Sequence, residues 1–414
     1  MAASRAKSAS TSTKKSTAAS AAKPAAKSAA KPAAKSAAKT TSQDAPADPN
    51  PHSASGAKAL DDTAGRAAAA ANSAKLPWAK GKRPSDKLSA EQLTTLYRTM
   101  LLARRFEEIV IEQFQEGNLP GFVHVAIGQE AIAAGVGHAL GDDDLIASTH
   151  RAHAHIVARG SSVEAMLAEM MGRITGLCQG KGGSMHLADM GNNVVGANGV
   201  VGSGAPMMAG VALAQQRLGT GNIAVAFYGD GASSQGNVHE ALNLAQIWRL
   251  PVVFILENNR YAESTPSWQT VPVDDLSMRG AAYDMKTFAV DGNDVLAMYD
   301  VATAAAEHAR TGEGPVYVVA ETKRLSGHYV GDAEVYRPKG EAKEARKTDP
   351  IPAFRAVLLN RKVKEAAIKA VEAEVEETMS KALEAALAAD APPAEDAMKH
   401  VYAEYPYAGP VVGI

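Results

Sequence analysis

The sequence has one cysteine and no long uninterrupted apolar run. The single Cys178 excludes an internal disulfide and a cysteine-based zinc cage within the chain, and it fits a reducing compartment. A membrane-spanning helix needs about 18 or more consecutive apolar residues, so we expect none here. With 46% hydrophobic and 21% charged residues, the composition is that of a globular protein.

Acidic residues are absent from residues 1–43, which contain nine lysines and arginines. Because the whole chain has a formal net charge of −2, its remaining residues carry −11. Residues 20–39 repeat Ala-Ala-Lys with proline or serine between, and the prolines oppose a continuous helix. We therefore expect residues 1–84 to form a disordered tail and linker, because the basic tail lacks the side chains that build a core.

The role of this basic tail stays open between a solvated spacer and a segment that binds an acidic partner or nucleic acid. A basic segment rich in serine and free of acids is also typical of a mitochondrial transit peptide. Arginine is rare here, however, and the prolines oppose the amphipathic helix that such peptides form. We expect the bacterial cytoplasm rather than the mitochondrial matrix, and a nucleic-acid partner is not the expectation.

The folded body is predicted at residues 85–390. Ser89 and Gln92 have the spacing of a helix-capping box and precede an apolar face at helical spacing. Near the other end, apolar residues step by three or four from Ile368 to Leu387, which predicts an amphipathic helix. Residues 391–414 end in an apolar and aromatic segment, so we expect them to dock on the body or on a partner.

Strand and helix patterns alternate through the middle of the chain. Residues 223–227, 252–256 and 314–322 are predicted strands, and residues 238–250 are a predicted helix. This alternation predicts an α/β fold, in which a parallel sheet carries helices on both faces.

Two polar positions follow neighbouring predicted strands. Asp230 lies in "GDG", and Asn259 ends "NN" after 26 intervening residues that contain a helix. Both side chains should therefore meet at the carboxyl ends of parallel strands, where open α/β sheets bind ligands. An aspartate and an asparagine offer only oxygen ligands, which suit Mg²⁺ or Ca²⁺ rather than zinc. Since Mg²⁺ usually completes its shell with phosphates and water, the pattern predicts a metal-bridged phosphate ligand.

This spacing resembles the thiamine-diphosphate motif of the α subunits of two-component 2-oxo acid dehydrogenases and acetoin dehydrogenases. The resemblance covers roughly residues 90–360. Four further segments are similar to landmarks of that family and occur in the expected order: GFVHVAIGQEA (121–131), GKGGSMHLAD (180–189), GANGVVGSGAP (196–206) and RLSGHYVGDAEVYRP (324–338). The resemblance implies the diphosphate-binding half of the thiamine-diphosphate fold, with thiamine diphosphate and Mg²⁺ as cofactors.

The resemblance also implies roles for individual residues. Mg²⁺ would bind Asp230, Asn259 and the backbone carbonyl of Tyr261. The other cofactor contacts would be Arg151, Gly199, Val201, Gly231, Ala232 and Arg324. The catalytic side chains that face the substrate would be His124, His150 and His328.

The segment "STHRAHAH", residues 148–155, gathers three histidines and an arginine. From spacing alone, a zinc site formed by these histidines remains open. The resemblance instead places Arg151 on the diphosphate, where a planar guanidinium fits phosphate oxygens, and His150 beside cofactor and substrate. We expect His153 near the site and His155 in a structural position.

Thiamine diphosphate requires a carboxylate that hydrogen-bonds its aminopyrimidine ring, and the chain provides one half of such a site. The resemblance implies that a β subunit supplies this carboxylate in an α₂β₂ assembly. It also implies that a lipoyl-bearing acyltransferase accepts the product.

The substrate stays open between acetoin, which would lose acetaldehyde, and pyruvate, which would lose CO₂; a branched-chain 2-oxo acid is a further alternative. Acetoin is the expectation, because His150 replaces a tyrosine that is common in pyruvate enzymes. Glu263 also stands where those enzymes carry a methionine-like residue, and its charge would repel a carboxylate substrate. A non-catalytic binding protein is the remaining alternative.

Overall fold

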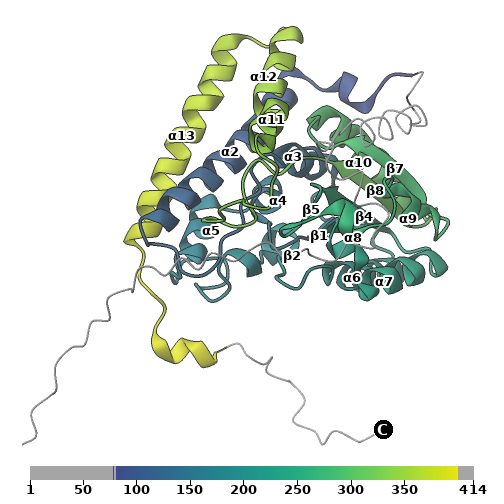
Figure 1. Ribbon diagram of the computed structural model, residues 1–414, viewed down its shortest axis with the longest axis horizontal. Coiled ribbons are helices and arrows are strands. Elements are labelled where there is room, and N and C mark those ends of the chain that lie inside the picture. Colours follow the sequence, from purple (N-terminus) through teal and green to yellow (C-terminus); the bar gives the residue numbers. More distant parts are fainter. Residues whose placement is uncertain (1–77, 79–80, 400–414) are drawn as a thin grey trace, which may run out of the picture. The chain divides into compact units, whose positions relative to one another are not determined.

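A computed structural model describes Trp78 and residues 81–399 (Figure 1). The predicted tail, residues 1–84, therefore lies largely outside the described residues, and so does the greater part of the predicted docking segment, residues 391–414. None of the helices in the described part of the chain is both long and apolar enough to cross a membrane.

A six-stranded sheet forms the centre of the body. Its order is β2-β1-β3-β4-β8-β7, and every neighbouring pair is parallel. The strands are β1 (Leu145–Ala147), β2 (Val194–Gly196), β3 (Ala224–Gly229), β4 (Val252–Asn258), β7 (Lys286–Asp291) and β8 (Val316–Glu321). The predicted parallel α/β sheet is confirmed.

Helices cover both faces of this sheet because its strands are apolar on both sides. On β3, Val225 and Phe227 join one hydrophobic cluster, and Ala226 and Tyr228 join another. The first cluster includes α3 (Glu130–Ala139) and α10 (Val295–Arg310); the second includes α6 (Gly204–Leu218) and α7 (Gly236–Ile247). Figure 1 shows these two helix pairs on opposite sides of the sheet.

Two long helices extend the first layer. In α2 (Ala90–Gln115), the predicted capping box is present, because Ser89 Oγ accepts from Gln92 N at 3.1 Å and Gln92 Oε1 from Ser89 N at 2.9 Å. The predicted C-terminal helix is α13 (Glu365–Ala388), which packs against α2 and against α5 (Val163–Met170). Its buried face differs from the prediction near the end: Ala386 is buried, whereas Leu387 is 40% exposed.

Shorter elements connect this frame. They are η1 (Pro84–Lys87), α4 (His153–Ala158), α5 (Val163–Met170), η2 (Ser184–His186), η3 (Met190–Asn192), η4 (Ala232–Ser234), β5 (Tyr261–Ala262), β6 (Thr265–Pro266), α8 (Ser267–Thr270), α9 (Ser277–Ala281), α11 (Glu341–Ala345), η5 (Arg346–Thr348), α12 (Pro350–Asn360) and η6 (Ala394–Met398). The start of the body is held by Asp300 of α10, which binds Arg83 at 2.6 Å and Ser85 N at 2.7 Å.

The ends of β3 and β4 lie side by side. Gly229 of β3 is in register with Glu257 of β4, so the residues that follow these strands meet at one edge of the sheet. This edge carries the cavity described next.

Candidate active site

A cavity of about 410 Å³ opens at the carboxyl ends of β3 and β4. Its lining includes all twelve residues predicted for the site: His124, His150, Arg151, Gly199, Val201, Asp230, Gly231, Ala232, Asn259, Tyr261, Arg324 and His328. These residues come from segments spread over about half of the chain, between residues 124 and 328, and the fold brings them together. Their individual roles stay predictions.

Asp230 lies at the bottom of the cavity, directly after β3. Its side chain is 1% exposed, and neither carboxylate oxygen has a hydrogen-bond partner among the described residues. Burial raises the pKa of this carboxyl to about 6, because a charged carboxylate without partners is poorly stabilised away from water. Two free oxygens on a buried acid fit a bound divalent cation of the hard type.

Asn259 and Tyr261 follow β4 on the same edge. The side-chain oxygen of Asn259 accepts from the backbone N–H of Tyr261 at 3.2 Å, and its amide donates to Gln129 at 3.3 Å. The backbone then enters the two-stranded β5–β6 hairpin. Oxygen donors from Asp230, Asn259 and the carbonyl of Tyr261 are thus available to one cation.

The backbone after Asp230 is held close to this hairpin. A side chain at Gly231 would place its Cβ 2.5 Å from Cβ of Ala262, so only glycine fits there. At Gly229 the atom nearest to such a Cβ would be 4.0 Å away, so the close approach concerns Gly231 and not Gly229. The backbone after Gly231 first forms the short turn η4, which Ala232 opens, and α7 starts at Gly236.

Arg151 provides a buried positive charge. Its side chain donates to the carbonyl of Val125 and, at 3.0 Å, to the carbonyl of His328. Burial, followed by repulsion from Arg324, lowers the pKa of this guanidinium to about 9, which still leaves it charged at neutral pH. Because no carboxylate of the described residues lies within ion-pair distance of Arg151, an anionic ligand in the cavity would be its counterion.

Arg324 provides a second positive charge from the loop after β8. It donates to the carbonyl of Glu263 at 3.0 Å and to the hydroxyl of Tyr336 at 2.8 Å. Asp332 fixes the same loop, because its carboxylate accepts from His328 N at 2.6 Å and from the hydroxyl of Tyr336 at 2.6 Å. These bonds place Arg324 and His328 on the cavity from one ordered loop.

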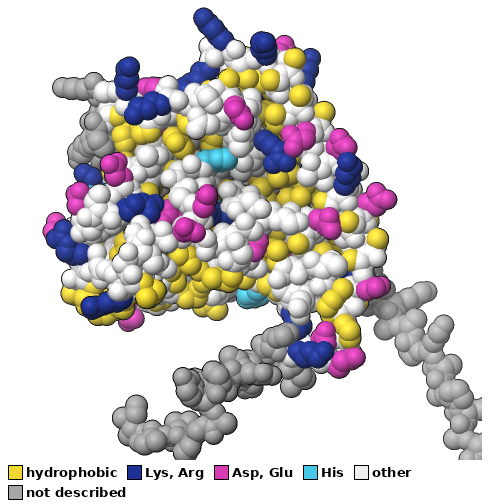
Figure 2. All heavy atoms as spheres, turned by 180° about the vertical axis from the view of Figure 1, so that it is seen from behind, with side chains coloured by type: hydrophobic (Ala, Val, Ile, Leu, Met, Phe, Trp, Pro, Cys, Tyr) yellow, Lys and Arg dark blue, Asp and Glu magenta, His cyan; other side chains and the backbone are white. Residues whose placement is uncertain are grey.

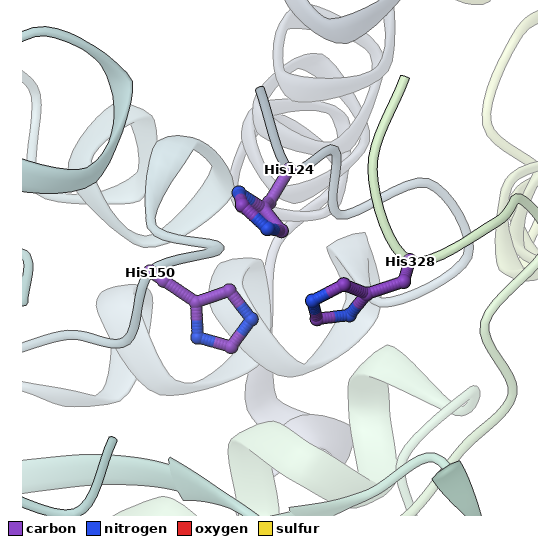
Figure 3. Close-up of side chains that lie close together, drawn as sticks. All are labelled: His124, His150 and His328. Atoms are coloured by element: carbon purple, nitrogen blue, oxygen red, sulfur yellow. The ribbon is translucent and has the colours of Figure 1, made fainter. Parts of the chain in front are cut away.

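His124, His150 and His328 face one another across the cavity (Figure 3). Their ring centres are 4.9 Å apart for His124 and His150, and 4.8 Å apart for His124 and His328. Burial, followed by repulsion from the charge of Arg151, lowers the pKa of each imidazole. The pKa falls to about 3 for His124, about 2 for His150 and about 4 for His328. All three rings are therefore uncharged at neutral pH.

The hydrogen bonds of His328 indicate its tautomer. A guanidinium N–H of Arg324 lies 3.4 Å from His328 Nδ1, and a guanidinium can only donate. Nδ1 of His328 is therefore the acceptor, and its proton resides on Nε2.

The other two histidines of "STHRAHAH" do not line the cavity. His153 is fully buried between Glu107 at 2.7 Å and Ser184 at 3.0 Å, and Glu107 also accepts from the backbone N–H of Ala126 at 2.7 Å. His153 therefore lies near the site, as expected, but behind the cavity wall, where its partner Glu107 holds the segment that carries His124. His155 stacks on Phe227 at 3.9 Å.

Glu257 and Gln129 also line the cavity and were absent from the sequence prediction. Glu257, on β4, is 3% exposed and lies 3.2 Å from His155 without hydrogen-bond geometry. Gln129 binds the amide of Asn259. An acid at the end of an apolar strand, directly before "NN", is unusual, and this feature of the sequence could have identified Glu257 as a site residue. No comparable feature of the sequence marks Gln129.

Comparisons with known proteins place this site in a family. The model of the dehydrogenase E1 component matches residues 97–395. The chain is 43% identical over 329 residues to the α subunit of acetoin:2,6-dichlorophenolindophenol oxidoreductase of Bacillus subtilis, which spans 79% of this chain and 98% of the relative. The corresponding subunit of Cupriavidus necator is 42% identical over 77% of this chain and 96% of the relative.

Pyruvate dehydrogenases are also relatives. The α subunit of the pyruvate dehydrogenase E1 component of Rickettsia bellii is 38% identical over 313 residues, which are 75% of this chain and 96% of the relative. The matched region contains the whole cavity. The chain therefore belongs to the dehydrogenase E1 component family, whose cofactor is thiamine diphosphate.

Proposed function

We propose that this chain is the α subunit of an acetoin dehydrogenase. In this reaction acetoin and the disulfide of a lipoyl group give acetaldehyde and an acetyl thioester with one free thiol, so the acetoin fragment is oxidised and the disulfide is reduced. The acceptor would be a lipoyl-bearing acyltransferase. Thiamine diphosphate, when bound, supplies the carbon that attacks the carbonyl carbon of the substrate.

The chain's own contribution begins with the diphosphate. The guanidinium groups of Arg151 and Arg324 are buried and positively charged, and neither forms an ion pair with a carboxylate at the cavity. Bidentate contact between a guanidinium and phosphate oxygens would neutralise both. Asp230, Asn259 and the carbonyl of Tyr261 would hold Mg²⁺, since the free oxygens of Asp230 otherwise leave a buried acid without a counterion.

The three histidines would act on the substrate as neutral groups. With pKa values between about 2 and 4, they are weak bases and remain unprotonated at neutral pH. A neutral imidazole can donate one hydrogen bond, and the proton of His328 is on Nε2, the nitrogen that does not face Arg324. His328 would thus orient the substrate's carbonyl or hydroxyl oxygen by hydrogen bonding.

A β subunit would complete the site. Val200 and Val201 line the cavity, and their side chains are 67% and 39% exposed. Further apolar side chains are exposed on α6 and α7, namely Met207, Leu218, Leu244, Ile247 and, just after α7, Trp248. Figure 2 shows hydrophobic side chains along the lower edge of the molecule, where these helices lie in that view. Such surfaces are typical of subunit interfaces.

The acid that activates the aminopyrimidine would come from that β subunit. Within this chain, Glu257 is in register with Gly229 and therefore lies beside Asp230, at the proposed metal end of the cavity. Gly199 and Val201, the expected aminopyrimidine contacts, lie in the exposed segment before α6.

The observation that carries the choice of acetoin is Glu263. This side chain is exposed, lines the cavity, and has its backbone held by Arg324 at 3.0 Å. Its negative charge disfavours a carboxylate substrate but leaves neutral acetoin unaffected. The names of the Bacillus and Cupriavidus relatives, which are oxidoreductases of acetoin, support the same choice.

Pyruvate is the alternative substrate, supported by the Rickettsia relative. Steady-state kinetics of the assembled α and β subunits with a dye acceptor separate the two. We expect a larger kcat/KM for acetoin than for pyruvate; the opposite ranking would overturn the substrate assignment and leave the E1 family membership intact.

A further inference from the structure

The three cavity histidines reach one point from three separate segments. His124 precedes α3, His150 precedes α4, and His328 lies in the loop after β8. One ring nitrogen of each lies within 4.8 Å of one nitrogen of each of the others. Figure 3 shows the rings turned toward a common centre.

Ring nitrogens remain available in this cluster. Nδ1 of His124 and both nitrogens of His150 are buried and have no hydrogen-bond partner among the described residues. His328 turns Nδ1 to Arg324 and its protonated Nε2 to the cavity, so metal binding at Nε2 would shift the ring proton to Nδ1 and break the 3.4 Å contact with Arg324. Buried nitrogens without partners are uncommon in folded proteins, because the lost hydrogen bonds to water cost free energy.

We propose that His124, His150 and His328 form a binding site for one transition-metal ion, Zn²⁺ or Cu²⁺, separate from the oxygen ligands of Mg²⁺. Imidazole is a preferred ligand of these ions, whereas Mg²⁺ prefers oxygen. Three nitrogens and one water would complete a tetrahedral shell. The uncharged state of the three imidazoles is the one that coordinates metals.

The geometry requires a small adjustment. Zinc–nitrogen bonds of about 2.0–2.1 Å put tetrahedral ligands roughly 3.3 Å apart. Nitrogens up to 4.8 Å apart can approach this separation by rotation of the side chains. The charges of Arg151 and Arg324 oppose a dication, so the site should bind more weakly than the same three ligands without them.

Occupancy of this site would block turnover. The ion would lie among the side chains proposed to orient the substrate, while Asp230 and Asn259 stay free for Mg²⁺. Zn²⁺ should therefore reduce activity without displacing thiamine diphosphate.

This site differs from the one that spacing alone left open. A zinc site of His150, His153 and His155 is wrong, because Glu107 and Ser184 hold the ring of His153 outside the cavity. Only His150 of that stretch joins the cluster.

The test uses the α and β subunits assembled with thiamine diphosphate and Mg²⁺. Zn²⁺ binding is measured by competition with a chromophoric chelator for the wild type, His124→Gln, His150→Gln and the control His308→Gln. His308 is partly exposed, pairs with Glu313 and lies outside the cluster. We expect one Zn²⁺ per α chain that His308→Gln retains and that each cluster variant binds at least roughly tenfold more weakly, since even indirect metal contacts are worth 10–100-fold.

A second measurement on the wild type is independent of how the variants fold. Electron paramagnetic resonance of one equivalent of Cu²⁺ should show hyperfine coupling to several imidazole nitrogens. Cu²⁺ spectra without nitrogen coupling, or Zn²⁺ affinities equal in all four proteins, would overturn the proposal. Neither readout depends on which substrate the enzyme uses.

Discussion

Replacing Asp230 with asparagine should stabilise the protein without its cofactor. The carboxylate is 1% exposed and its oxygens have no hydrogen-bond partner among the described residues, so ionisation at neutral pH costs folding free energy. Asparagine has nearly the same shape and no charge. Asp230→Asn therefore removes an unfavourable buried charge, but it also removes the proposed ligand of Mg²⁺.

The shift in pKa gives the magnitude. Burial raises the pKa of Asp230 from 3.8 to about 6, and each pKa unit corresponds to about 1.4 kcal/mol. The free energy of unfolding should thus rise by up to about 3 kcal/mol in the variant at pH 7.5, less whatever the buried amide loses in hydrogen bonds to water. This gain corresponds to an increase in Tm of up to roughly 6 °C.

The pH dependence follows from the direction of the shift. A carboxyl whose pKa is higher in the folded than in the unfolded state binds more protons when folded, so its destabilising effect is absent at low pH. The effect grows as the pH rises from about 4 to about 6 and is complete above that. The difference in stability between Asp230→Asn and the wild type should therefore be largest at pH 7.5 and should vanish near pH 4.

The assay is thermal unfolding of the assembled α and β subunits, stripped of cofactor, across this pH range. The matched control is Asp144→Asn: Asp144 is equally buried but binds Arg310 at 2.6 Å, so its loss should lower Tm. With thiamine diphosphate and Mg²⁺ added, the wild type should become the more stable protein. A destabilised Asp230→Asn variant without cofactor would refute the reasoning.

Three further substitutions test other parts of the site. Gly231→Ala places a Cβ 2.5 Å from that of Ala262 and should lower the free energy of unfolding by roughly 1–3 kcal/mol. It should also weaken cofactor binding, as measured by cofactor-induced quenching of tryptophan fluorescence; unchanged binding would contradict the close approach. Arg151→Lys should weaken cofactor binding more than it lowers Tm, because lysine cannot make bidentate phosphate contacts; equal affinity would remove Arg151 from the diphosphate site. Glu263→Gln should raise kcat/KM for pyruvate by roughly fivefold, because removing a repulsive exposed charge is worth about 1 kcal/mol. The kcat/KM for acetoin should stay unchanged, and an unchanged kcat/KM for pyruvate would remove Glu263 from substrate selection.

Local sequence patterns predicted the parts of the fold that local physics determines. The capping box of Ser89 and the strands β3, β4 and β8 were predicted, because caps and long apolar runs are local features. β1 and β2 have three residues each, which is too short for a periodic pattern, and they were not predicted.

The site was predictable where residues follow a strand and not where partners are distant in sequence. Asp230 and Asn259 meet because β3 and β4 are adjacent, which spacing alone indicated. The burial of His153 depends on Glu107, which lies 46 residues earlier, so a histidine in a histidine-rich segment gave no sign of it. The same limit applies to Glu257, whose place on the cavity depends on the register of the sheet.

The central claim is that this chain is one half of an acetoin-cleaving enzyme. The most direct measurement is dye reduction with acetoin by the purified α chain, by β alone and by their mixture, each with thiamine diphosphate and Mg²⁺. We predict activity in the mixture alone, with a larger kcat/KM for acetoin than for pyruvate. Turnover by the isolated α chain at the rate of the mixture, or a preference of the mixture for pyruvate, would contradict this account.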